Sequence, residues 1–217
     1  MISPAHAARI TVRALPLGFT ETNCYLVSDE ATKITVVIDP GDEAGRILAL
    51  IEQHALDVKA VLLTHAHFDH IGAVGDVVQA TGAPLFIHPL ELPLYRAGGG
   101  AALFGLPPRH YPEPDSLIEP GKAIAAGPLK FEVLFVPGHT IGHVALYNAE
   151  ARAVFSGDVL FHDGIGRTDL PGGNYATLMH SLRAVLFALP DETTVYSGHG
   201  PATTLGRERV SNPFLAE

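Results

Sequence analysis

Short runs of β-branched and aromatic residues recur along the chain and predict strands. We expect these strands at residues 24–28, 34–41, 60–65, 84–88, 130–139, 144–148, 153–158 and 193–200. Intervening segments carry apolar residues at helical spacing, at 43–56, 71–82 and 175–189. The last of these follows Gly-Gly-Asn and stops before Pro190, as expected of a capped helix. Helices and strands mix throughout, which predicts one α/β or layered α+β domain spanning residues 1–217.

The segment 93–115 breaks this pattern, because it is rich in glycine and proline and has no regular spacing of apolar residues. A long segment of this kind in a compact domain is typical of a functional loop. We therefore expect a mobile loop that closes over a bound substrate as a lid.

Composition and charge exclude several classes of protein. The chain has 14 Lys and Arg against 23 Asp and Glu, a net charge of −9, so no basic surface for nucleic acid or an anionic membrane is expected. Its 47% hydrophobic residues suffice for a full core, yet no run is long enough to span a bilayer. Cys24 is the single cysteine, so an internal disulfide is impossible. Residues 1–18 lack the apolar stretch of a signal peptide, which predicts a cytoplasmic protein.

Polar residues of the kind that bind metals follow four of the expected strands. The segments are "VLLTHAHFDH", "VLFVPGHT", "AVFSGD" and "TVYSGHG". A rigid sheet with glycine-permitted turns at its edge can bring side chains from distant parts of the sequence to one point. These strand ends therefore predict a common site.

The densest of these segments predicts two adjacent metal sites. His65 and His67 are two residues apart and can bind one ion, because imidazole nitrogen suits zinc or iron. Asp69 and His70 follow at once, and a helix expected to begin near Ile71 would direct them to a second point. The remaining donors are His139, His199 and Asp158, whose two carboxylate oxygens can bridge both ions.

The motifs "THAHFDH", "PGHT", "SGD" and "SGHG", in this order, resemble the metallo-β-lactamase superfamily over nearly the whole chain. Within it, "FSGDVLF", "GIGRTDLPGG" and "SGHGPATTLGRERVSNPFL" are similar to short bacterial glyoxalase II-like hydrolases. The resemblance implies an αββα sandwich of two mixed β-sheets flanked by helices, with the metals at one edge. By motif matching, it gives the first ion to His65, His67 and His139, the second to Asp69, His70 and His199, and the bridge to Asp158.

The resemblance also implies an activity. Two divalent ions, with zinc preferred over iron or manganese, would activate a hydroxide that attacks a small-molecule thioester such as hydroxyacylglutathione. Asp69 is the expected catalytic residue, which orients this nucleophile or takes its proton. Arg167 is expected to bind a substrate carboxylate, and Asp39 to orient a ligand histidine from behind. His143 is expected to be structural.

Three alternatives stay open. A persulfide dioxygenase of the same fold would use one iron on His65, His139 and Asp158. A lactone, lactam or other ester hydrolase would use the whole site, and a metal-sensing module would bind ions without turnover. Full-length glyoxalase II enzymes continue into a helical region that helps to hold glutathione, and this sequence has no matching segment. The acyl and thiol parts of the substrate, the metal and the oligomeric state are therefore left open.

Overall fold

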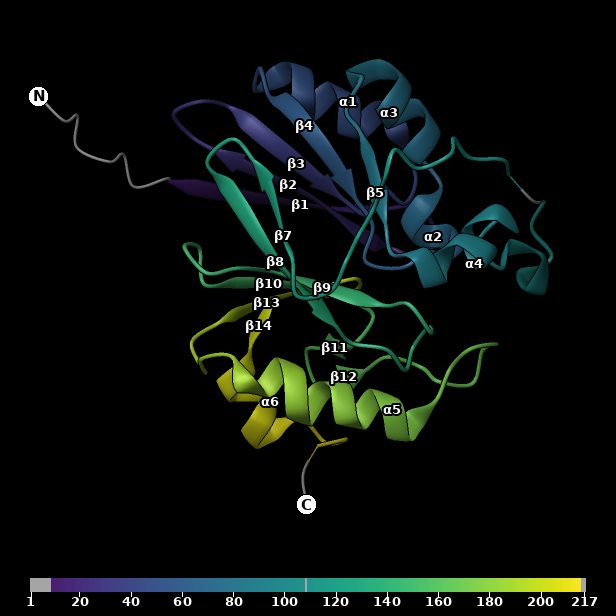
Figure 1. The fold of residues 1–217 in the computed structure, drawn as a ribbon, viewed down its shortest axis with the longest axis vertical. Helices are drawn as coiled ribbons and strands as arrows, with labels where there is room; N and C mark the ends of the chain where they lie inside the picture. Colours follow the sequence, from purple (N-terminus) through teal and green to yellow (C-terminus); the bar gives the residue numbers. More distant parts are fainter. Residues whose placement is uncertain (1–8, 108, 216–217) are drawn as a thin grey trace, which may run out of the picture.

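The computed structural model describes residues 9–107 and 109–215. Its first sheet has the order β1-β2-β3-β4-β5-β6. The strands are β1 (Ile10–Leu17), β2 (Thr22–Asp29), β3 (Ile34–Ile38), β4 (Asp57–Leu62), β5 (Leu85–Ile87) and β6 (Ser116–Leu117). The helices α1 (Ala44–Gln53) and α3 (Val74–Thr81) lie over the outer face of this sheet (Figure 1).

The second sheet lies beneath the first and has the order β14-β13-β10-β9-β8-β7. Its strands are β7 (Ala123–Ala126), β8 (Leu129–Phe135), β9 (Val144–Asn148), β10 (Ala153–Gly157), β13 (Thr194–Ser197) and β14 (Thr203–Thr204). The helices α5 (Tyr175–His180) and α6 (Leu205–Ser211) cover its other face, and β11 (Leu160–Phe161) pairs with β12 (Gly164–Ile165) nearby. Parallel and antiparallel pairs occur in both sheets, which confirms the αββα sandwich.

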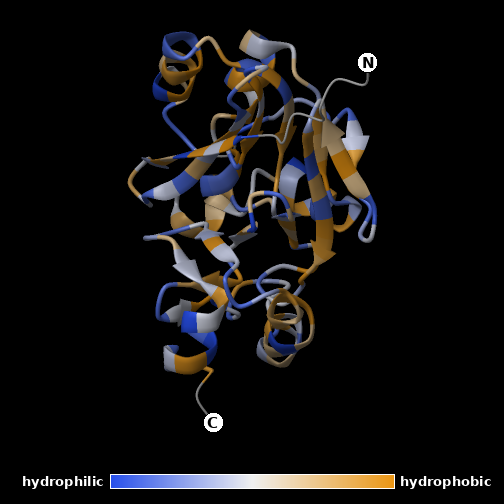
Figure 2. Cartoon of the chain, turned by 90° about the vertical axis from the view of Figure 1, so that its left-hand side faces the viewer, coloured by the Kyte–Doolittle hydropathy of each residue, from blue (hydrophilic) through white to orange (hydrophobic). Residues whose placement is uncertain are grey.

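Strand β2 shows why the chain forms layers. Its side chains alternate between two apolar clusters, so Cys24 and Leu26 pack under the helices while Tyr25 and Val27 pack between the sheets. Every residue of β2 is buried, as expected for a strand covered on both faces. Figure 2 shows apolar residues concentrated in the strands and on the inner sides of the helices.

Each strand expected from the sequence is present, and several more were missed. The missed elements are β1, β6, β7, β11, β12, β14 and α6. The sequence analysis compared residues 1–18 with a signal peptide. Residues 1–8 lie outside the described part of the chain, and strand β1 occupies most of the remainder. It is an edge strand paired only with β2, which explains its half-exposed side chains and its tolerance of Pro16. Among the described residues, no helix is long and apolar enough to cross a membrane.

Two expected helices differ from the prediction. In place of one helix at 71–82, the chain forms α2 (Phe68–Ile71) followed by α3. Helix α2 starts three residues earlier than expected and itself carries Asp69 and His70. The segment 175–189 begins as α5 and continues through a π-helical turn and a 3₁₀ turn to residue 188. Its predicted cap is present, because Asn174 Oδ1 accepts a hydrogen bond from Thr177 N at 2.9 Å.

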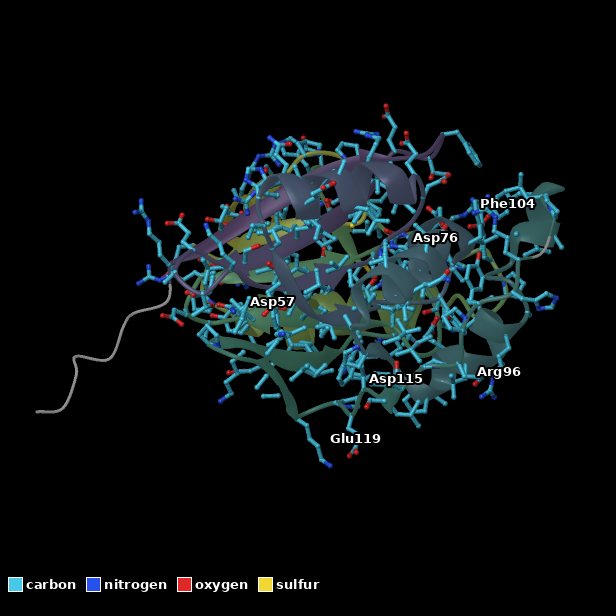
Figure 3. All side chains as sticks on the ribbon, turned by 90° about the horizontal axis from the view of Figure 1, so that it is seen from above. Asp57, Asp76, Arg96, Phe104, Asp115 and Glu119 are labelled. Carbon is cyan, nitrogen blue, oxygen red and sulfur yellow. The ribbon has the colours of Figure 1, made fainter. Side chains whose placement is uncertain are left out.

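The segment 93–115 is more regular than the loop expected from the sequence, whereas its mobility and its closure as a lid stay predictions. The segment contains most of α4 (Leu92–Arg96) and a 3₁₀ turn, Ala101–Phe104. It is also tied to the sequence around the histidine cluster, because Phe68 N donates to Gly99 O at 2.9 Å. A deletion within 97–102 would therefore disturb the start of α2, which carries Asp69. In Figure 3, Arg96 and Phe104 of this segment lie at the opposite end of the molecule from Asp57, the first residue of β4.

Candidate metal centre

The two sheets meet at one edge, where the predicted ligands converge. Backbone hydrogen bonds join the sheets there, from Val144 N to Thr64 O at 2.9 Å and from Asn23 N to Gly198 O at 2.7 Å. The contact is close at Gly198, since a Cβ atom on this residue would overlap Asp158 Oδ1. Glycine at this position therefore lets the turn after β13 lie directly against the turn after β10.

Three histidines bring ring nitrogens together at the first site. His67 Nδ1 lies 3.1 Å from His65 Nε2 and 2.8 Å from His139 Nε2. His139 Nδ1 donates to a backbone oxygen, that of Arg167, at 2.8 Å, which leaves a lone pair on Nε2. Burial, more than the neighbouring imidazoles, keeps the pKa of His65 well below its usual value and lowers that of His67 to about 3. Neutral imidazoles whose nitrogens point at one spot form a site for a cation.

The tautomer of His65 follows from its neighbours. Thr64 Oγ1 donates to Asp39 Oδ2 at 2.6 Å and is left to accept from His65 Nδ1 at 3.1 Å. The proton of His65 is therefore on Nδ1, and Nε2 presents its lone pair to the site.

His70 and Asp69 lie on α2 beside this first group. His70 Nδ1 donates to Asp39 Oδ2 at 3.0 Å, so its Nε2 faces inward. That Nε2 lies 3.4 Å from Asp158 Oδ1 and 3.8 Å from Asp69 Oδ2. Asp69 Oδ2 also accepts a hydrogen bond from Thr22 Oγ1 at 2.8 Å, which fixes the carboxylate.

His199 completes the second group from the end of β13. Its Nδ1 donates to Thr20 O at 3.1 Å, and its Nε2 lies 3.3 Å from Asp69 Oδ2 and 3.5 Å from Asp158 Oδ2. Burial alone would lower the pKa of His199, but hydrogen bonds to Asp158 and Asp69 raise it to about 9. In the metal-free protein, a proton therefore occupies a position that a cation would take.

Asp158 lies between the two groups, as the sequence predicted for a bridge. Its Oδ1 faces His70, whereas its Oδ2 lies 3.6 Å from His139 Nε2 and 3.5 Å from His199 Nε2. Asp158 Oδ1 and His70 Nε2 are both buried and have no hydrogen-bond partner. Buried polar atoms without a partner are costly unless something binds them. The donor set and these two atoms therefore fit a pair of divalent cations.

Asp39 contacts the candidate centre through Thr64 and His70, and its predicted role in orienting a ligand histidine stays a prediction. Its carboxylate accepts from Thr64 N at 2.8 Å, Thr64 Oγ1 at 2.6 Å and His70 Nδ1 at 3.0 Å. Its φ of 50° is unusual for a residue other than glycine, though Asp and Asn tolerate it. Because Asp39 keeps this strained conformation while it binds Thr64 and the candidate ligand His70, we infer that it positions the histidines.

Asp39→Asn tests this role, since asparagine tolerates the same backbone conformation. We expect metal affinity to fall about 10- to 100-fold, because the amide is a weaker acceptor for the His70 N–H. Metal titration by competition with a chromophoric chelator measures the change. Asp57→Asn, at the exposed start of β4, is the matched control. Unchanged affinity in Asp39→Asn would remove Asp39 from the centre.

The structure also gives a role to His143, which the sequence analysis treated as structural. Its ring stacks on His65 with centroids 4.6 Å apart, and its Nε2 accepts the backbone N–H of Asp158 at 3.1 Å. Its one sequence signal is the "GHTIGH" spacing, which places it next to β9. His143 thus supports one ligand of each predicted group.

A cleft opens beside Asp69, and sequence reasoning did not find it. Its apolar lining comes from Phe19, Phe68, Ala101, Leu106 and Pro107, and its polar lining from Thr20, Asp42, Asp69, Arg109 and Tyr111, with Gly41 and Gly72. Five of these residues, Ala101, Leu106, Pro107, Arg109 and Tyr111, belong to the predicted lid, so this part of it lies near the centre. Asp69 belongs to both the cleft and the metal centre, which connects a bound substrate to the ligands.

Arg167 lies differently from the expectation that it grips substrate. Its guanidinium makes two hydrogen bonds of 2.7 Å to the carboxylate of Asp169, and it is not among the residues that line the cleft. Its carbonyl oxygen, by contrast, orients His139. The substrate-binding role of Arg167 stays a prediction, which requires Asp169 to release the side chain.

Comparison with known proteins identifies the class. The model of the Metallo-beta-lactamase superfamily matches residues 17–199, and the chain belongs to this superfamily. It is a metallo-hydrolase of that class, whose members bind divalent metal ions.

Among curated relatives, the chain is 43% identical over 207 residues to the probable metallo-hydrolase YqgX of Bacillus subtilis, covering 94% of this chain and 96% of the relative. It is 39% identical over 209 residues to the hydroxyacylglutathione hydrolase GloC of Haemophilus influenzae, covering 95% and 98%.

Two solved structures share the fold of this chain. The protein TTHA1623 in a di-iron-bound form matches with a TM-score of 0.86 and 48% identity, over 94% of this chain and all of that one. BLEG-1, a B3 metallo-beta-lactamase, matches with a TM-score of 0.91 and 39% identity, over 95% of this chain and all of that one.

Proposed function

We propose that the chain is a dinuclear metal hydrolase that cleaves thioesters of the hydroxyacylglutathione type. The observation that carries this proposal is the position of Asp158. Its Oδ2 lies between His139 of the first group and His199 of the second, and its Oδ1 lies 3.4 Å from His70 Nε2. These last two atoms are buried and make no hydrogen bond. The relative named for hydroxyacylglutathione hydrolysis, which the chain matches over nearly its whole length, supports the substrate class.

The residues of the chain have separate tasks in this reaction. His65, His67 and His139 would hold one ion, Asp69, His70 and His199 the other, and Asp158 both. Two such ions, when bound, would supply Lewis acidity that lowers the pKa of a water and polarises a carbonyl. Asp69 would orient that water and accept its proton, because its carboxylate lines the cleft and is fixed by Thr22. No serine or cysteine nucleophile is required, so no covalent acyl-enzyme should accumulate.

The persulfide dioxygenase alternative needs only His65, His139 and Asp158. That reading leaves the buried Nε2 of His70 without a metal, and it assigns no metal to Asp69 and His199 beside it. The cost of the buried His70 nitrogen favours the dinuclear hydrolase.

Metal analysis combined with two assays tests the proposal. Purified protein should contain about two divalent ions per chain and should hydrolyse S-D-lactoylglutathione, followed by loss of thioester absorbance. Oxygen uptake with glutathione persulfide should be absent. One iron per chain with oxygen uptake would overturn the proposal, and so would fully metal-loaded protein that cleaves no thioester.

A further inference from the structure

The cleft beside Asp69 contains one positive and one negative side chain that do not pair. Arg109 Nη1 donates to Gly72 O at 3.1 Å, and Asp42 Oδ1 accepts from Glu43 N at 2.7 Å. No ion pair of either side chain is found in the described residues, whereas Arg96 is bound to Glu113 at 2.6 Å. An unpaired guanidinium and an unpaired carboxylate are thus both available to a ligand in one cleft.

The side chain of Tyr111 is close enough to Arg109 and Asp42 for both charges to affect its pKa. Burial raises the pKa of Tyr111 above its usual value, Arg109 opposes that shift, and Asp42 adds to it. All three side chains line the cleft. The phenol therefore lies near both charges, which remain apart from each other.

The backbone group that Arg109 contacts lies a short way along the chain from Asp69. Gly72 follows Asp69 by three residues on and just after α2, so the anchor of Arg109 is about 5 Å along the helix from Asp69. The aromatic rings of Phe19 and Phe68 stack at 6.3 Å beside this path. A ligand that starts at the metal centre can therefore contact both the apolar rings and the charges, because all of them line the same cleft as Asp69.

We infer that Arg109 and Asp42 bind the amino-acid end of the thiol arm of the substrate. The carboxylate of that end pairs with Arg109 and its ammonium group with Asp42, while the chain between them and the thioester lies against Phe68. This inference rests on the proposed thioester hydrolysis and deepens it. It makes a thiol that ends in an α-amino acid, as the γ-glutamyl end of glutathione does, the selected leaving group.

Three thioesters with the same lactoyl group separate the two contacts. They are the glutathione thioester, its N-acetylated form without the ammonium charge, and the neutral N-acetylcysteamine thioester. We expect Arg109→Gln to raise KM about tenfold for both glutathione substrates and to leave KM for the neutral one unchanged. Asp42→Asn should raise KM only for the substrate with a free amine. The value of kcat should hold in each case, because these contacts are present in both the ground and transition states.

Arg96→Gln is the matched control, since this arginine lies on the same segment but is paired with Glu113 outside the cleft. Equal KM values of wild type for the charged and neutral thioesters would overturn the inference and leave the proposed function intact. A KM effect from Arg167→Gln, with none from Arg109→Gln, would move the anion site to Arg167. If wild type cleaves none of the three thioesters, the proposed function itself fails.

Discussion

Asp158→Asn should remove both metal ions and reduce kcat/KM for lactoylglutathione by more than about 100-fold. Loss of a group that only orients a metal ligand reduces metal affinity or activity by about 10- to 100-fold. Loss of Asp158 should cost more, because Asp158 is itself the expected bridging ligand. The neutral amide offers one oxygen, whereas Asp158 has Oδ1 near His70 and Oδ2 near both His139 and His199. Both sites should therefore weaken together.

Elemental analysis after gel filtration measures this effect, with turnover of the thioester recorded on the same sample. Asp163→Asn is the control, because Asp163 is an exposed carboxylate nearby that pairs with Arg207. In excess chelator, the Asp158→Asn protein and wild type should both unfold cooperatively, which separates loss of metal from loss of fold. Retention of one full equivalent of metal with normal turnover would show that Asp158 does not bridge.

The convergence of the candidate metal donors was predictable because each belongs to a local motif. His65, Asp158 and His199 follow apolar strands beside residues that permit tight turns, so their types and their convergence could both be inferred. The mixture of helices and strands alone predicted one α/β or layered α+β domain, and the αββα order of the layers came from the resemblance to the superfamily. The sequence analysis placed the start of this helix too late. Helix α2 begins at Phe68, whose N–H bonds to Gly99, and a contact between such distant residues cannot be inferred from local spacing.

The substrate cleft was not predictable for a physical reason. Asp42 and Arg109 are far apart in the sequence, and neither stands in an unusual local pattern. Arg167 stands in a recognisable motif, yet Asp169, two residues later, occupies its guanidinium. A side chain's type and motif indicate what it can bind, whereas its availability depends on neighbours that only the folded chain brings together.

Removal of the metals should make the stability of the protein decrease between pH 6.5 and 9. In the metal-free state, burial opposes protonation of His199, but hydrogen bonds to Asp158 and Asp69 raise its pKa to about 9 from a usual 6.5. A raised pKa in the folded state stabilises the fold fully below the unfolded value, and this contribution is lost as pH rises through about 9. His70, whose pKa is raised by the same carboxylates against the effect of burial, acts in the same direction.

Bound metal removes most of this dependence, because the ions need the same histidines in their neutral form. The midpoint temperature of unfolding should therefore fall with pH in chelator, by about 3–10 °C for roughly 1–3 kcal/mol, and stay nearly level with metal bound. The gap between the two curves should widen toward pH 9. His199→Gln in chelator should show a smaller decrease, since it has no ring to deprotonate. A metal-free wild type whose midpoint temperature rises across this range would contradict the protonated state of His199.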